Sequence, residues 1–456
     1  MTPDLRVGAV FVQTVRHFFP QFNTWLDQLP DDRDQEAITY PRRLLAWWGL
    51  LLYVLQLGSR RQLDYDLRAE GTQVLANLNR LAQTDLDTRP VHDTLDYYLG
   101  PAQVTGLERL RTQANQRLLR MKVLEPARVL GHVPLITDGT GHLAFGQQHC
   151  DRCLRQRHGQ TTVYLHQVLE AKFLGPDGLV CSVGSAFIEN EPGWERLPAE
   201  ERKQQCELKA MDQLAPQVKR AYPQLKICWL GDALWACGRA FQIAQTNRWT
   251  FVFTFKEGRL PTLWQDFQAL LPLVPQQVLT VALPDGTVQE YRWVNGLDYE
   301  DSDQRRWKLN ALQCRETPVD APAQLFAWLT WLPLTRQTVV AVAEQGGRTR
   351  WAIENEGFNR QKNSGLRLEH VYRTDPDKLK AYYLLLQIAH LLLLLLEKGS
   401  LLRRVVAEWN TTVLGWFGSL KRIAQRLLES LRYWPWPEEC FAGPLGARPR
   451  GGWDSS

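Results

Sequence analysis

Several features that mark special classes of protein are scarce in this chain of 456 residues. Its 8 cysteines are too few and too irregularly spaced to form the disulfide framework of a small secreted protein. Glycine and proline, with 31 and 25 residues, are too rare for a collagen-like or low-complexity chain. The most apolar window, Leu384–Leu396, has 13 residues and includes Gln387 and His390, whereas a membrane-spanning helix needs about 20 apolar residues. We therefore expect a globular protein that contacts no membrane, with this run as a buried core helix.

The first residues lack the pattern of a secretory signal peptide. Asp4 occurs early and Arg16 interrupts the apolar stretch, whereas a signal peptide has a basic start followed by an unbroken apolar centre. Scattered, reduced cysteines are typical of the cytosol. The sequence therefore predicts a cytoplasmic protein.

Neither sign of charge is in large excess. The net charge of +5 and the isoelectric point near 8.7 give a mild bias toward an anionic partner that decides nothing alone. Lysine is scarce, with 13 residues against 41 arginines. The planar guanidinium of arginine suits two simultaneous hydrogen bonds to a phosphate, although the codon usage of a GC-rich genome would enrich arginine equally. Composition therefore permits a nucleic acid partner without selecting one.

Apolar residues recur at helical spacing through most of the first 128 residues. The clearest segments are Leu44–Leu57, Leu63–Leu81 and Val104–Leu124. Turn-forming residues at Gly58-Ser59 and Gly100-Pro101 separate these segments. We predict an all-α N-terminal domain over residues 1–128.

Between residues 129 and 259 the pattern changes to short β-rich runs bounded by Gly and Pro. Three such runs come first, and an amphipathic helix over 199–221 follows them. A buried strand, a short helix and a further strand complete the segment. The predicted order of elements is βββαβαβ.

The remaining chain divides into three parts. Residues 260–335 contain a predicted hairpin with Asp285-Gly286 at its turn, and we interpret them as a β-rich insertion. Residues 336–433 are predicted to be helical. From residue 434 the chain contains four Pro and four Gly within twenty residues, so we predict a flexible tail over 434–456.

Three acidic residues stand at related points of these elements. Asp138 is predicted to end the first strand, Asp232 to end the fourth, and Glu354 to lie on the first long helix after the insertion. The first and fourth strands are neighbours in a sheet with the ribonuclease H order of strands, so the two aspartates would face each other. Three carboxylates at one cleft suit Mg²⁺, and two such ions can stabilise the attacking and leaving oxygens of a phosphoryl transfer.

Each acid also has an ordinary structural interpretation. Asp138-Gly139 fits a turn after a strand, and Gly231-Asp232 fits a turn into a capped helix. Glutamate is common in helices, and Glu356 competes with Glu354 for the third position. The joint placement of the three acids favours a metal site over these alternatives.

The segments around the three acids resemble a known family. The sequences ITDGTG around Asp138, WLGDALWA around Asp232 and RWAIENEGFN over Arg350–Asn359 are similar to those of bacterial insertion-sequence DDE transposases. The resemblance covers roughly residues 130–375. It implies an RNase H-like core interrupted by a β-rich insertion between the second Asp and the Glu, which are 122 residues apart here. The expected fold is α/β, an RNase H-like core (βββαβαβ…α) with this insertion, preceded by the all-α domain.

The resemblance also implies an activity. Asp138, Asp232 and Glu354 would be the catalytic residues and the ligands of two Mg²⁺ ions, with Mn²⁺ as a substitute. The reaction would be cleavage at the ends of the element, followed by attack of the freed 3′-hydroxyl on another phosphodiester. The partners would be double-stranded DNA, as terminal inverted repeats and as target, and a second copy of the chain in a homodimer on DNA. Such a protein would work in the bacterial cytoplasm at the nucleoid, with its N-terminal domain binding DNA ends.

The helix motif of that family is matched only in part. It runs Tyr, two residues, Arg, three residues, Glu, six residues, Lys; Arg350 and Glu354 match it, whereas Gly347 stands at the Tyr position and Gln361 at the Lys position. At about 100° per residue, Arg350, Glu354 and Gln361 share one helix face. The predicted DNA contacts are Arg350, Asn359, Gln361, Lys362, Arg60, Arg61, Arg152 and Arg155. For the two basic residues at 60 and 61, an ordinary solvated helix face would have the same pattern.

A second cluster contains possible zinc ligands. His149, Cys150 and Cys153 are close in sequence and are followed by His158, and CxxC is half of a tetrahedral zinc site. A second CxxC at finger spacing is missing, and adjacent His149 and Cys150 are poorly placed to bind one ion together. We therefore favour a basic loop that contacts DNA through Arg152 and Arg155, and we regard zinc at Cys150 and Cys153 as the less favoured interpretation.

Two other functions remain open. A domesticated DNA-binding protein with the same fold would need no cleavage activity, although the intact set of acids argues against it. An RNase H-like nuclease would cut without joining strands. Such nucleases tend to be compact, so the helical N-terminal region and the long insertion favour the transposase.

Overall fold

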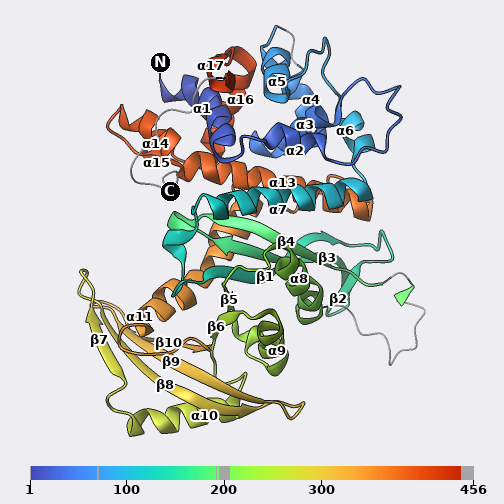
Figure 1. Cartoon of the computed structure of the whole chain (residues 1–456). Helices are drawn as coiled ribbons and strands as arrows, with labels where there is room; N and C mark the ends of the chain where they lie inside the picture. Colours follow the sequence, from blue (N-terminus) through green and yellow to red (C-terminus); the bar gives the residue numbers. More distant parts are fainter. Residues whose placement is uncertain (1, 69–70, 192, 195–205, 443–456) are drawn as a thin grey trace.

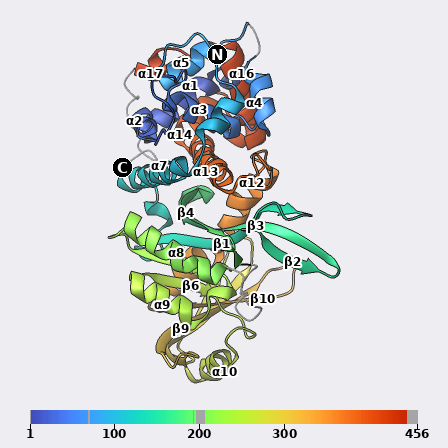
Figure 2. The ribbon, with the colours of Figure 1, turned by 90° about the vertical axis from the view of Figure 1, so that its right-hand side faces the viewer.

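The computed structural model describes residues 2–68, 71–191, 193–194 and 206–442. Three tiers follow one another along the molecule: a layer of helices, a mixed sheet flanked by helices, and a β-rich extension of that sheet (Figure 1). The view in Figure 2, turned by 90°, shows the same three tiers from the side. The protein is therefore of the mixed α/β class, with a helical N-terminal region as predicted.

Helices from both ends of the chain make up the helical layer. Those of the N-terminal region are α1 (Pro3–Phe18), α2 (Phe22–Asp27), α3 (Arg42–Val54), α4 (Arg60–Leu67), α5 (Val74–Ala82), α6 (His92–Tyr98) and α7 (Pro101–Arg120), followed by the 3₁₀ turn η1 (Glu125–Ala127). Those of the C-terminal region are α13 (Pro376–Lys398), α14 (Ser400–Ala407), α15 (Val413–Phe417), α16 (Leu420–Tyr433) and α17 (Glu439–Ala442). Helix α1 packs against α14, α16 and α17, and α13 contacts both α3 and α7. The predicted N-terminal helices therefore share their core with the end of the chain.

Local sequence signals fix several helix ends. Helices α1 and α7 begin with proline, which has no amide hydrogen to leave unpaired in the first turn. Ser59 accepts a hydrogen bond from the backbone nitrogen of Gln62 at the start of α4 (3.1 Å). Asp375 accepts one from the backbone nitrogen of Lys378 at the start of α13 (2.9 Å). These are the capping interactions that side-chain oxygens make with the unpaired amides of a first turn.

Helix α13 contains the longest apolar run and lies inside the protein. Together with α14 it is long and apolar enough to cross a membrane by composition, yet 94% of its most apolar window is buried in the protein. Gln387 and His390 on this helix are also buried. The helix is thus apolar on all sides because it is surrounded by protein, as the prediction of a core helix required, and this burial is consistent with a soluble protein.

The described strands form one ten-stranded mixed sheet. They are β1 (Val133–Phe145), β2 (Leu154–His158), β3 (Thr161–Leu174), β4 (Val180–Ile188), β5 (Ile227–Gly231), β6 (Thr250–Thr254), β7 (Val278–Ala282), β8 (Val288–Glu300), β9 (Arg306–Thr317) and β10 (Gln324–Thr330). Their order is β2-β3-β1-β5-β6-β10-β9-β8-β7, with β4 also paired to β3. Strands β1, β5 and β6 are parallel, and β3 is antiparallel to β1. The first strand is therefore central in its half of the sheet.

One strand was not predicted. β2 pairs with the first half of β3, and the short turn η2 (Pro176–Gly178) joins β3 to β4. The sequence of β2, LRQRH, has one apolar residue, so it carries no alternating apolar pattern from which to predict a strand. The order before the first helix of this segment is therefore ββββ instead of βββ. That helix, α8 (Glu207–Ala221), is described from residue 206 onward, so the predicted start at 199 lies outside the described residues.

Helices cover both faces of the central strands. Helix α8 packs on β3 and β4, and α9 (Gly238–Asn247) packs on β6. On the opposite face lie α7, α13 and an irregular helical segment, which consists of α11 (Val339–Ala341), η6 (Val342–Gly347), η7 (Arg348–Trp351), η8 (Ile353–Asn359) and α12 (Arg360–Asn363). Arg111 on α7 donates hydrogen bonds to Ser182 and Ser185 of β4 across this second interface. The segment with Glu354 thus lies against the same face as α13.

The segment predicted as a β-rich insertion continues the sheet. It contains α10 (Pro261–Leu270), the turn η5 (Leu271–Leu273) and strands β7 to β10. β10 pairs antiparallel with β6, from Trp328 opposite Thr254 to Thr330 opposite Val252. The added strands are therefore joined to the central strands by backbone hydrogen bonds and lengthen one sheet (Figure 1).

The prediction of a flexible tail from residue 434 is wrong for its first part. Trp436 is 2% exposed, and its backbone nitrogen donates to Asn77 (2.9 Å). Its indole Nε1 donates to Ser430, and its carbonyl accepts from Arg80. Composition suggested disorder, but the two tryptophans here supply enough apolar surface for one of them to pack. Residues 443–456 lie outside the described residues.

Candidate functional site

Asp138 and Asp232 occupy equivalent positions on neighbouring parallel strands. β1 and β5 pair from Val133 opposite Ile227 to Ile136 opposite Leu230, an offset of 94 residues. Asp138 and Asp232 have the same offset and lie two residues beyond the last pair. Neighbouring strands are about 4.8 Å apart. The pairing of β1 with β5 therefore confirms that these two strands are neighbours, and it brings the two aspartates to one edge of the sheet.

Asp138 does not end its strand. β1 continues to Phe145, and Asp138 lies opposite Glu170 of β3. On the other side, the pairing of β1 with β5 stops at Ile136, so this side of Asp138 has no paired strand. The interpretation of Asp138-Gly139 as a turn is therefore wrong, since both residues belong to an extended strand beside an opening in the sheet.

Asp232 begins a short helical turn. Its Oδ1 accepts a hydrogen bond from the backbone nitrogen of Leu234 (2.9 Å), at the start of η4 (Ala233–Trp235). The alternative of a helix cap is thus correct for Asp232. A cap uses one carboxylate oxygen and does not prevent the other from binding a metal.

Glu354 approaches this edge from the face of the sheet that α7 and α13 cover. It lies on η8, which has π-helical turns, a rare form that is frequent at functional sites. Arg350 donates to Glu354 (3.0 Å) and lies 3.8 Å from Asp138. Glu356 instead pairs with Arg360 (3.1 Å) and Lys398 (3.2 Å). Glu354 and not Glu356 therefore faces Asp138.

A fourth acid, Glu207, belongs to the same group and was missed by the sequence interpretation. It is the first residue of α8 and is close enough to Gly139 that a Cβ at position 139 would collide with its carboxylate. Burial, and then the charge of Asp232, raise the pKa of Glu207. Acids are ordinary in the first turn of a helix, so Glu207 carried no signal; the one hint was a glycine directly after Asp138.

The group carries an excess of negative charge. Burial first, and then the charge of Glu354, raise the pKa of Asp138 from 3.8 to about 7; the charge of Glu207 adds to this and the guanidinium of Arg350 opposes it. Oxygen ligands with unneutralised charge suit a hard divalent cation. Within the described residues, the oxygens of Asp138, Asp232 and Glu354 do not all lie within 4.8 Å of one another. Arg350 instead neutralises part of the charge.

The raised pKa of Asp138 predicts how stability depends on pH in metal-free protein. The folded state holds the Asp138 proton more tightly than the unfolded chain, so the resulting stabilisation is complete below about pH 4 and is lost as pH rises through about 7. We expect Asp138→Asn, which has no carboxylate to ionise, to melt at a higher temperature than the wild type at pH 8. The difference should shrink toward pH 4. Thermal unfolding in chelator at both pH values measures it, and equal differences at both would contradict the charge assignment.

The two departures from the helix motif have different structural causes. A side chain at Gly347 would collide with Trp328 of β10, so an aromatic ring from a neighbouring strand fills this space. Gln361 is fully buried and donates to Gln387 (2.8 Å), with His390 Nδ1 at 3.0 Å. The prediction that Gln361 contacts DNA is therefore wrong. Spacing along one helix gives no information about α13, whose Gln387 and His390 bind Gln361.

The other predicted DNA contacts from the helical segment differ in exposure. Arg350 is 7% exposed and is paired with acids. Asn359 is exposed. Lys362 is paired with Glu369 (2.8 Å). Asn359 and Lys362 therefore remain accessible candidates, whereas Arg350 could contact DNA only after leaving its carboxylates.

The predicted contacts elsewhere are partly engaged within the protein. Arg60 lies 3.2 Å from Asp96, and Arg61 beside it is exposed. Arg152 lies 3.6 Å from Asp377 of α13, and Arg155 stacks over the ring of Tyr164 (5.5 Å). Arg60 therefore joins α4 to α6, and Arg152 joins the loop before β2 to α13. Their contact with DNA stays a prediction.

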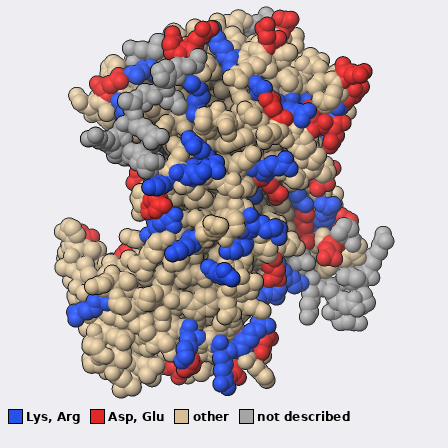
Figure 3. Space-filling model, in the orientation of Figure 1, with Lys and Arg blue, Asp and Glu red and all other residues tan. Residues whose placement is uncertain are grey.

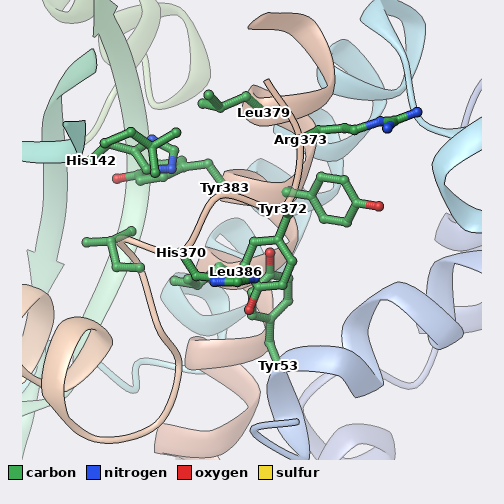
Figure 4. A pocket seen from close by; sticks show the side chains of 11 residues that line it. Tyr53, His142, His370, Tyr372, Arg373, Leu379, Tyr383 and Leu386 are labelled. Atoms are coloured by element: carbon green, nitrogen blue, oxygen red, sulfur yellow. The ribbon is translucent and has the colours of Figure 1, made fainter. Parts of the chain in front are cut away.

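The surface and the internal cavities indicate where a large substrate fits. Basic side chains predominate across the middle of the face in Figure 3, between the helical layer and the lower part of the sheet. A pocket lined by Tyr53, His142, Tyr372 and Tyr383 lies between α3, α13 and β1 (Figure 4). Its volume of about 10 Å³ accommodates about one water molecule. This pocket is therefore too small to hold any part of a nucleic acid.

The interpretation of the CxxC segment as a loop without metal is weakened by the structure. Among the described residues, one group of three or more His, Cys, Asp or Glu side chains has all its ligand atoms within 4.8 Å of one another. It consists of His149, Cys150, Cys153 and His166. The expectation that adjacent His149 and Cys150 are poorly placed to bind one ion together is wrong, because their ligand atoms lie within 4.8 Å of each other. His158 is exposed on β2 and does not belong to the group. His166, which comes from β3, was not considered because its sequence position gives no finger spacing.

Comparison with known proteins adds no identification. Neither the family models nor the curated proteins that were searched include a match for this chain. A functional assignment therefore depends on the geometry of its own residues.

Proposed function

We propose that this protein is a DDE transposase, which cleaves DNA at the ends of an insertion sequence and transfers the strands. The observation that carries the proposal is the equivalent placement of Asp138 and Asp232 on parallel strands, with Glu354 facing Asp138. The neighbouring positions of β1 and β5 support an RNase H-like core with one added strand, β2, and a β-rich insertion.

The protein groups at the site suit this reaction. Asp138, Asp232 and Glu354 would hold two Mg²⁺ ions, or Mn²⁺ in their place, since their combined charge is only partly neutralised by Arg350. When bound, the ions would stabilise the attacking and leaving oxygens of the phosphoryl transfer. Arg350 would then be free to exchange its carboxylate partners for a DNA phosphate, which offers the same pair of oxygen acceptors.

The partners follow from the chemistry of the surface. The basic band (Figure 3) and the net charge of +5 favour double-stranded DNA, both terminal repeats and target. Cleavage and joining at two element ends would require a homodimer on DNA. The place of action would be the bacterial cytoplasm at the nucleoid.

The experiment that tests the function is a cleavage and joining reaction on DNA that carries the flanking ends of the gene. With Mg²⁺ or Mn²⁺ we expect nicked ends and joined products, and with chelator neither product. Separation of the cut and joined DNA products on a gel distinguishes the alternatives. Cut ends without joined products would indicate a nuclease, and binding of the ends without cleavage would indicate a domesticated DNA-binding protein.

A further inference from the structure

Four side chains with metal-binding chemistry meet at the connection between β1 and β2. His149, Cys150 and Cys153 lie on this connection, and His166 lies beneath it on β3, opposite Leu143 of β1. Cys153 and His166 are buried, with 3% and 2% exposure. The group lies apart from the carboxylates, and the proposed transposase activity does not use it.

The distances between the ligand atoms match a tetrahedral ion. The two Sγ atoms are 3.4 Å apart, and His166 Nε2 lies 3.5 Å from each of them. His149 Nδ1 lies 3.4 Å from Cys153 Sγ. With Zn–S near 2.3 Å and Zn–N near 2.0 Å, the edges of a tetrahedral site are roughly 3.4–3.8 Å. Four of the six distances therefore match a tetrahedral zinc site, and all four ligand atoms lie within 4.8 Å of one another.

Neighbouring groups orient the ligands as they do at zinc sites. His166 Nδ1, on the ring side away from the sulfurs, lies 3.7 Å from Glu189. Glu189 is itself held by Lys380 of α13 (2.8 Å). Metal-bound histidines commonly present their second nitrogen to a carboxylate, which fixes the ring and its tautomer. The next residue, Asn190, donates to the backbone carbonyl of Cys153 (2.9 Å). The two residues that follow β4 therefore contact both His166 and Cys153.

We propose that His149, Cys150, Cys153 and His166 bind one structural Zn²⁺. Two thiolates and two imidazoles at tetrahedral spacing select zinc among the common divalent ions. Four protein ligands leave no open position for a substrate, so the ion stabilises structure and does not take part in a reaction.

The ion would fix the base of a projecting hairpin. β2 and the first half of β3 extend from the body of the molecule (Figure 2). From Gln156 to Thr161 the residues are exposed, and an isolated two-stranded hairpin has little stability in water. Zinc would join the loop before β2 to His166 on β3, and so hold this basic arm in one orientation.

The first test is the metal content of protein purified without chelator. We expect about one zinc per chain in the wild type, and less than about 0.2 in Cys150→Ser and His166→Ala. The control variants Cys206→Ser and His158→Gln, at exposed positions outside the group, should keep the zinc. Glu189→Gln should bind zinc about 10- to 100-fold more weakly, because the second nitrogen of His166 loses its charged partner.

Two further measurements use the wild type alone, in case a variant does not fold. Replacement of zinc by Co²⁺ should give the intense visible absorption of a tetrahedral thiolate site. Removal of zinc should accelerate tryptic cleavage at Arg155 and Arg157, and re-addition should reverse this. Four results would each overturn the proposal. Wild type purified under argon could contain no metal, or mass spectrometry could detect a Cys150–Cys153 disulfide. Both ligand variants could retain zinc, or tryptic cleavage could be unchanged by zinc removal.

Discussion

Asp138→Asn, Asp232→Asn and Glu354→Gln are each expected to reduce DNA cleavage by at least about 1000-fold. Each change removes one carboxylate oxygen ligand from a site where burial and neighbouring acids raise the pKa of Asp138 and Glu207. Loss of a metal ligand removes several kcal/mol of transition-state stabilisation, and each 1.36 kcal/mol corresponds to a factor of ten in rate. Cleavage of labelled end DNA under single-turnover conditions measures the effect.

The matched control for this series is Glu356→Gln. Glu356 lies two residues from Glu354 on the same segment but pairs with Arg360 and Lys398. We expect this variant to cleave at close to the wild-type rate, and all four variants to bind end DNA. If Glu356→Gln lost cleavage while Glu354→Gln retained it, the third acid of the site would be wrongly assigned.

Trp436→Ala is expected to destabilise the protein by about 3–5 kcal/mol, as truncation of a buried aromatic side chain does. Trp436 is almost fully buried and hydrogen-bonded to Ser430, and it packs so closely on Gly8 that a side chain at position 8 would collide with it. The variant therefore leaves a cavity between α1 and α16. Urea unfolding followed by circular dichroism measures the loss.

Trp434→Ala provides the control, because Trp434 is 44% exposed and only two residues away. Its removal should cost less than about 1 kcal/mol. Equal effects of the two substitutions would mean that residues 434–442 do not pack on the helical layer, in agreement with the composition of this segment.

The elements of regular pattern were predictable from the sequence. The helical character of the first 120 residues, the buried helix α13 and strands β1 and β5 follow from local periodicity, caps or bounding turns. The segment predicted over Leu63–Leu81 is instead two helices, α4 and α5. Strand β2 was missed because its residues are polar and arginine-rich. The packing of Trp436 was missed because its partners, Asn77 and Ser430, belong to other helices.

The candidate sites show the same division. Asp138, Asp232 and Glu354 were singled out by the predicted order of elements together with the resemblance of their segments to a known family. Gln361 was misplaced because spacing along one helix cannot reveal that α13 buries it. Glu207 and His166 are ordinary residues in their own segments, and no local pattern connects them to the groups that they join in space.

The sequence by itself predicted the mixed α/β class of the protein, most of its helices and strands, and three of the four acids near Asp138, because periodicity depends on residues close together in the chain. The tertiary structure alone decided that Glu354 and not Glu356 faces Asp138, that Arg350 bridges two of the acids, and that His166 completes a group of four metal-binding side chains. These depend on side-chain directions and on contacts between distant segments. Burial and close packing fix both, and neither is encoded in local spacing.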